Sequence, residues 1–223
     1  MDQKEPLGRS ETIGLLRSLV ERYIQEHGEP PRVLMAVGGS AMILHGLRKE
    51  SDDADFYSSV REVEEIAMDL SRETGYEIDV TSKKNLWGDL VIPDIESDAV
   101  VVEQINVMGY VVDVAALSPE ALFVVKASSM REKDRNDLPA LLSVTSPDKI
   151  MVRFASLWSA QDPYVRDEAL VNLVSEIQLV TRALPDPSWF ESIPEKILKK
   201  WNKVLEESGI EFDNPSETVG FHP

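Results

Sequence analysis

The residues best suited to chemistry are two aspartates, Asp53 and Asp55, separated by Ala54. In an extended strand, residues two positions apart project from the same face, so both carboxylates point in one direction. Like charges on one face repel each other unless a cation lies between them. Hard divalent cations, Mg²⁺ or Mn²⁺ in its place, take oxygen ligands, and Mg²⁺ commonly shares its coordination with substrate phosphates. The pair therefore predicts a divalent metal site on a strand.

A third carboxylate, Asp113, stands alone in the apolar run Tyr-Val-Val-Asp-Val-Ala. An unpaired charge in apolar surroundings is costly, so this side chain needs a partner. A metal shared with Asp53 and Asp55 would supply one, and a helix N-terminus or a lysine would serve as well. We expect Asp113 to complete the metal site.

The apolar run 33–37 leads directly into Gly38, Gly39 and Ser40. Glycines allow a backbone to approach a phosphate closely, and the N-terminus of a following helix favours an anion. Ser40 is the expected N-cap of that helix, and its hydroxyl could bond a triphosphate. The stretch predicts a phosphate-binding turn opposite the metal site.

The elements that must position these groups differ between the two halves of the chain. Hydrophobic periodicity predicts strands and helices in the first half, including a hairpin that turns at Gly109, and only helices in the second. We therefore expect an α+β fold, a mixed sheet flanked by helices in residues 1–117, followed by a helical region in residues 118–223. The expected strands are 33–37, 53–57, 76–81, 99–108 and 110–115, and the expected helices are 11–27, 40–47, 60–74, 118–130, 135–143, 147–159, 163–183 and 193–207.

Composition excludes several classes of protein. The chain has no cysteine, which rules out disulfides, thiolate metal sites and cysteine nucleophiles. Its net charge of -17 repels phosphate backbones and argues against a general nucleic-acid coat protein. The first residues are too polar for a signal peptide, and no apolar run reaches the length of a membrane span. We expect a soluble cytoplasmic protein that does not enter a membrane.

The pattern Gly39-Ser40 followed by Asp53-Ala54-Asp55-Phe56 resembles the signature of the DNA polymerase β-like nucleotidyltransferase superfamily. The resemblance implies transfer of a nucleoside monophosphate from a Mg²⁺-bound nucleoside triphosphate, such as ATP, to a hydroxyl group. One metal would activate the hydroxyl and a second would hold the triphosphate. The resemblance implies that Asp113 is the third family carboxylate and helps to activate the acceptor hydroxyl. The chain departs from the pattern at Asp52, where the family often has a β-branched or basic residue.

A later segment, from Lys126 to Arg131-Glu-Lys133-Asp-Arg-Asn-Asp137-Leu, is similar to a helix pair of small prokaryotic nucleotidyltransferases. Some of those proteins are toxins of toxin–antitoxin and abortive-infection systems, so the resemblance implies an antitoxin protein as a partner. It also implies that a lysine contacts the nucleotide phosphates. Lys126 and Lys133 are the candidates, with Arg131 behind them. The resemblance covers residues 33–142.

Two other functions remain open at this point. The chain could be a catalytically inactive nucleotide-binding or protein-interaction module of the same fold, or a plain interaction protein that uses its helical half. If it is an enzyme, the residues do not identify the acceptor, which could be a transfer RNA, a protein or a small molecule. For Lys126 the structural alternative is a solvated helix lysine, and for Asp113 it is a surface residue or a salt bridge.

Overall fold

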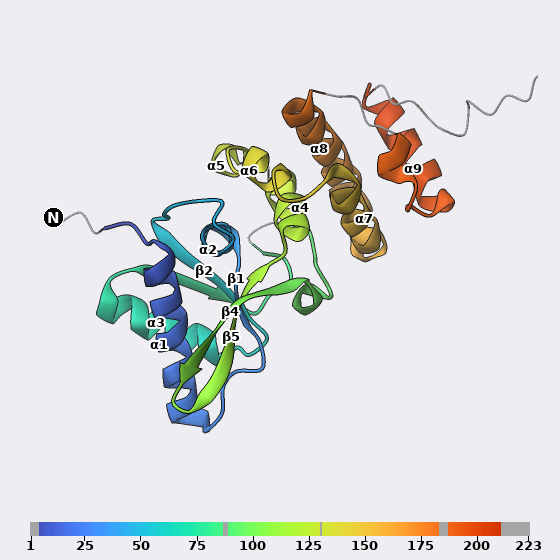
Figure 1. Ribbon diagram of the computed structural model, residues 1–223. Helices are drawn as coiled ribbons and strands as arrows, with labels where there is room; N and C mark the ends of the chain where they lie inside the picture. The colour runs from blue at the N-terminus through green and yellow to red at the C-terminus, as the bar shows by residue number, and fades with distance from the viewer. Residues whose placement is uncertain (1–4, 87–88, 130, 183–186, 211–223) are drawn as a thin grey trace, which may run out of the picture. The chain divides into compact units, whose positions relative to one another are not determined.

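A computed structural model describes residues 5–86, 89–129, 131–182 and 187–210 of the chain. These residues form two compact units, shown in Figure 1. The first unit takes its residues from 1–84 and 94–118, and the second from 85–93 and 119–223. The sequence predicts a change of region between residues 117 and 118. The structure adds the segment 85–93 to the helical unit.

The first unit contains one five-stranded mixed sheet with the strand order β3-β2-β1-β5-β4. β1 is antiparallel to β2 and parallel to β5, β2 is parallel to β3, and β4 and β5 form an antiparallel hairpin. This arrangement confirms the expected α+β fold. The strands are β1 (Leu34–Ala36), β2 (Asp53–Ser58), β3 (Glu77–Thr81), β4 (Ala99–Val107) and β5 (Tyr110–Leu117).

Helices accompany the sheet of the first unit: α1 (Arg9–His27), α2 (Gly38–Leu44), α3 (Glu62–Thr74) and the short 3₁₀ helix η1 (Ile95–Asp98). α1 buries a stripe of apolar residues at helical spacing, which include Leu15, Leu19 and Val20. α1 and α3 lie side by side in Figure 1, and α3 also packs on β3. These contacts help to anchor the sheet, so that β2 can present polar side chains on its other face.

The second unit is helical, as the periodicity predicts. Its α4 packs against α6, α7 and α8. The expected single helix over 135–143 is instead two short helices, α5 and α6, with Asp137 at the N-cap position of α6. The elements are α4 (Pro119–Ser129), α5 (Glu132–Arg135), α6 (Leu138–Leu142), α7 (Pro147–Leu157), η2 (Trp158–Ala160), α8 (Pro163–Thr181), η3 (Pro187–Phe190) and α9 (Glu195–Glu207).

One side chain ties the segment 85–93 to this helical unit. The amide of Gln161 accepts a hydrogen bond from the Val91 N–H at 2.8 Å and donates one to the Val91 carbonyl at 2.6 Å. Gln161 is itself buried, as are the neighbours of Val91, Leu90 and Ile92. The bonds satisfy both backbone polar groups of Val91. Among the described helices, none is both long and apolar enough to cross a membrane.

Candidate functional site

The turn between β1 and α2 closes around the carboxylate of Asp55. Gly38 has a φ of +52°, and a Cβ at this position would lie 2.4 Å from Asp55 Oδ2. The N–H of Gly39 donates a hydrogen bond to the same oxygen at 3.1 Å. Residue 38 therefore has to be glycine for two reasons, its left-handed backbone and the absence of space for a side chain.

The two aspartates of β2 lie on one face of the strand, as the alternation predicts. Asp53 and Asp55 are partly exposed, whereas Ala54 and Phe56 on the other face are fully buried. Asp53 and Asp55 therefore share one face of β2, and their role as metal ligands stays a prediction. The strand is thus anchored by its apolar face while it presents two carboxylates on the other.

Asp53 is held from the N-terminal side of its strand. Its Oδ1 accepts a hydrogen bond from the Ser51 hydroxyl at 2.7 Å. Ser51 is buried, and its backbone exchanges two hydrogen bonds with Leu7 at 2.8 and 3.0 Å. The chain segment at Leu7 therefore helps to fix Ser51, and through it the carboxylate of Asp53.

Ser40 has a different place from the one expected. α2 begins at Gly38 with Val37 at the N-cap position, so Ser40 lies inside the helix and does not cap it. Its hydroxyl is fully buried and accepts a hydrogen bond from the Asp55 N–H at 3.0 Å. Ser40 thus links α2 to β2, and its assignment to the triphosphate stays a prediction.

Asp113 does not lie close to Asp53 and Asp55, so the three aspartates do not form the expected group. Ala115 and Tyr57 are both level with Met35, and β5 runs opposite to β2. Asp113 comes two residues before Ala115, and Asp55 comes two residues before Tyr57. Because the two strands run in opposite directions, the two aspartates lie on opposite sides of the level of Met35. The offset is four residues, about 13 Å along the strands. Asp113 is exposed and accepts a hydrogen bond from the Gln104 amide at 2.8 Å.

A different carboxylate, Asp79, lies level with Asp55. β2 and β3 are parallel, and their register pairs Asp55 with Asp79 and Asp53 with Glu77. The signal in the sequence is the alternation Glu77-Ile78-Asp79-Val80, which puts both acidic residues on one face of a strand. In the described parts of the chain, however, no three His, Asp or Glu side chains are close enough to hold a metal ion together.

Arg48 is a second residue that the motif does not indicate. Its Nη1 lies 3.4 Å from the position that a Cβ on Gly39 would occupy, so the guanidinium is next to the glycine turn. The side chain is exposed. The structure therefore places a cation next to the glycine turn, where charged ligands such as phosphates would meet it.

Lys126 belongs to the second unit, where it is the centre of a buried ionic cluster. Its Nζ lies 2.7 Å from Asp134 Oδ1 and 2.8 Å from Asp137 Oδ2. Lys126 is only 5% exposed and Asp134 only 1%. The second oxygen of Asp134 accepts hydrogen bonds from the Ser129 hydroxyl and from Arg131 Nε. The structural alternative of a solvated lysine is therefore wrong for Lys126.

The cluster changes the titration of Asp134. Burial by itself raises the pKa of this carboxyl, but the hydrogen bond and charge of Lys126, with help from Ser129 and Arg131, outweigh burial and hold the pKa below its usual range. Lys133, by contrast, is exposed and has no ion pair with another described residue. The assignment of Lys126 and Lys133 to nucleotide phosphates stays a prediction.

Comparison with known proteins identifies the family. No curated protein sequence matches the chain at a significant level. The model of a family described as a nucleotidyltransferase of unknown function (DUF6036) matches residues 15–156, more than half of the chain. The match includes the glycine turn, Asp53 and Asp55, and the Lys126 cluster. The chain belongs to this nucleotidyltransferase family.

Proposed function

We propose that this protein is a metal-dependent nucleotidyltransferase that moves a nucleoside monophosphate from a nucleoside triphosphate, such as ATP, to a hydroxyl acceptor. The observation that carries the proposal is the glycine turn closed around Asp55, with Asp53 on the same face of β2. Membership of a nucleotidyltransferase family supports the class of reaction.

The donor set fits Mg²⁺ or Mn²⁺. Asp53 and Asp55 offer carboxylate oxygens, which these ions prefer, and Mg²⁺ completes its coordination with water and substrate phosphates rather than with a full protein cage. Two protein carboxylates are therefore sufficient to hold it. When bound, the metal would stabilise negative charge on the transferring phosphate. Gly38 lets the Asp55 carboxylate pack directly against the backbone of the turn, because a Cβ at this position would clash with it.

We assign the remaining steps of the transfer to residues according to their positions and exposure. In the transfer, the acceptor oxygen bonds to the α-phosphorus, the bond from that phosphorus to the oxygen bridging to the β-phosphate breaks, and pyrophosphate leaves. We assign the hydroxyl proton to Asp79, which is level with Asp55 and exposed. Arg48 beside the turn would neutralise the triphosphate. Lys133 is exposed and available for the same task, whereas Lys126 would first have to leave Asp134 and Asp137.

The acceptor can be a transfer RNA, a protein or a small molecule. The proposal that the protein is the toxin of a toxin–antitoxin pair, with an antitoxin protein as its partner, rests on the sequence resemblance of residues 33–142. Co-expression with the product of the adjacent reading frame would test it, because an antitoxin restores growth that the toxin arrests.

Thermal melting tests the proposed site. Wild type, Asp53→Asn/Asp55→Asn and the control Asp113→Asn are melted with each of the four nucleoside triphosphates, with and without Mg²⁺. Asparagine keeps the shape of the carboxylate and its acceptor oxygen but removes its charge. A ligand at 100 times its Kd stabilises the native state by about 2.7 kcal/mol. We expect a Mg²⁺-dependent rise with a triphosphate, lost in the double variant and kept in Asp113→Asn.

Pyrophosphate release separates the enzyme from the inactive module. Release on addition of an acceptor, lost in Asp53→Asn/Asp55→Asn, supports transfer. A melting shift without release for any acceptor class would favour the inactive nucleotide-binding module. A well-folded protein that shows no shift with any triphosphate would overturn the proposal.

A further inference from the structure

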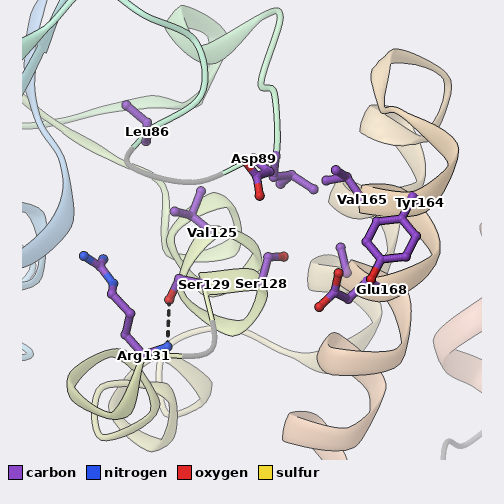
Figure 2. Close-up of a pocket in the computed structure, with 11 residues that line it drawn as sticks. Leu86, Asp89, Val125, Ser128, Ser129, Arg131, Tyr164, Val165 and Glu168 are labelled. Atoms are coloured by element: carbon purple, nitrogen blue, oxygen red, sulfur yellow. Dashed lines mark hydrogen bonds between the residues drawn. The ribbon is translucent and has the colours of Figure 1, made fainter.

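A pocket of about 430 Å³ is lined by described residues of the second unit alone. Figure 2 shows its lining, which comes from the 85–93 segment, from α4 and from α8. The volume is within the range of small-molecule sites. The nucleotidyltransferase proposal leaves this pocket unexplained.

Two carboxylates of the lining have no partner among the residues that the structure describes. Asp89 comes from the 85–93 segment and Glu168 from α8, so the fold brings them to one pocket from distant parts of the sequence. Both are exposed, and among the residues that the structure describes neither has a hydrogen bond or an ion pair. No described side chain therefore neutralises their two negative charges.

The one cation of the described lining does not balance them. Arg131 forms an ion pair through its Nε with the buried carboxylate of Asp134, and this pairing neutralises its charge. In Figure 2 the end of the Arg131 side chain points away from Asp89 and Glu168. An anion in this pocket would meet two uncompensated carboxylates, so the pocket favours a cation.

The rest of the lining favours an organic cation over a bare metal ion. Apolar side chains, among them Val125 and Val165, line the same pocket. They offer carbon surface to a ligand and no oxygen to a metal. The Tyr164 ring lies next to Glu168 in Figure 2, and an aromatic face attracts an ammonium group. The Ser128 side chain, between the two carboxylates in the same view, adds a hydroxyl.

We propose that this pocket binds a small organic cation that carries ammonium groups on an apolar carbon frame, such as an alkyl diamine. Asp89 and Glu168 accept hydrogen bonds from the ammonium groups, and the valine side chains cover the carbon frame. The proposal does not depend on the nucleotidyltransferase site, because Asp89, Glu168 and the two valines have no role in the proposed transfer.

Calorimetric titration of the full chain with cadaverine tests the site, and pentanediol serves as the uncharged analogue. The variants are Asp89→Asn and Glu168→Gln, and the matched control is Glu206→Gln, an exposed glutamate of α9 outside the pocket. Loss of one charge-assisted hydrogen bond weakens binding about tenfold. We expect that loss in each pocket variant, wild-type affinity in Glu206→Gln, and no binding of pentanediol.

Three results would overturn the inference. If pentanediol bound as tightly as cadaverine, the ammonium charges would not contribute to binding. Equal weakening in Glu206→Gln would mean that the diamine follows the general negative charge of the protein. Absence of cadaverine binding to the folded wild type would remove the site. No nucleotide is present in this titration, so a failure here leaves the proposed transfer reaction untouched.

Discussion

Asp53 in the first unit and Asp134 in the second are both motif aspartates, but their surroundings differ. Asp53 is partly exposed, and the partner of its carboxylate is the Ser51 hydroxyl. Asp134 is buried, and Lys126, Arg131 and Ser129 surround its two oxygens. The charge of Asp134 is matched inside the protein, whereas that of Asp53 has a neutral partner. A motif carboxylate can thus stabilise the fold through ion pairs or be left without a cationic partner and so be suited to bind a ligand. Its surroundings determine which of the two applies.

The largest expected effect is on the buried cluster. Replacement of Lys126 with Met removes the cation from between Asp134 and Asp137, and an uncompensated buried charge costs about 3–5 kcal/mol. Urea denaturation should show that loss in the free energy of unfolding. Lys199→Met is the control, because Lys199 pairs with Glu195 on the exposed face of α9 and its loss should not be measurable. If Lys126→Met were as stable as wild type, the charge of Asp134 would not depend on Lys126, and the contrast with Asp53 would not hold.

Acid should weaken the same cluster more gently, since Asp137 still faces Lys126 when Asp134 is protonated. The pKa of Asp134 is lower in the folded protein than its ordinary value of 3.8. The unfolded chain therefore binds the proton first, and the stabilisation is complete above that value and lost as the pH falls through the folded pKa. Unfolding free energies of wild type and Asp134→Asn, measured from pH about 5 to about 2, should converge as the pH falls. A constant difference would contradict the shift.

A smaller loss is expected at the glycine turn. Gly38→Ala places a side chain on a left-handed backbone, which costs about 1–3 kcal/mol, and its Cβ meets the Asp55 carboxylate. The variant should lose stability and also the nucleotide-dependent rise in melting temperature. Gly14→Ala is the control, because a Cβ there has open space within α1, and it should be neutral or stabilising. If both variants behave alike, the turn does not depend on its glycine.

The smallest effect concerns the hydroxyl that holds Asp53. Ser51→Ala removes one hydrogen bond and should cost about 1 kcal/mol of stability. Because the carboxylate keeps its charge, we expect Mg²⁺ affinity to fall only severalfold, measured by titration calorimetry. Asp53→Asn removes the charge itself and should abolish the binding. Equal effects of the two substitutions would mean that Ser51 is a ligand and not a positioning residue.

Local patterns in the sequence predicted most elements of the fold. Alternation across Asp53, Ala54, Asp55 and Phe56 identified the strand and its two faces, and Gly109 marked the hairpin. These features depend on neighbours in the sequence, so spacing alone reveals them. The predicted start of α2 was less accurate. The helix begins at Gly38, which has a left-handed backbone, two residues before Ser40.

The site could be predicted only in part. The sequence places Asp113 on a strand, but its level in the sheet depends on the pairing of β5 with β1, a long-range choice that spacing does not encode. For the same reason Asp79 was overlooked, although its alternating strand was recognised. The burial of Lys126 follows from the packing of α4 against α5, α6, α7 and α8, which no local pattern shows.

The bond between Gln161 and Val91 limits how this protein can be divided. The chain passes from one unit to the other after residues 84, 93 and 118. A fragment cut at residue 118 would keep Val91, Leu90 and Ile92 but lose the helices that bury them. Exchange of the helical region between relatives, by recombination or by gene fusion, would have to carry residues 85–93 along with it. The helical unit is thus encoded in two separate pieces of the sequence that have to change together.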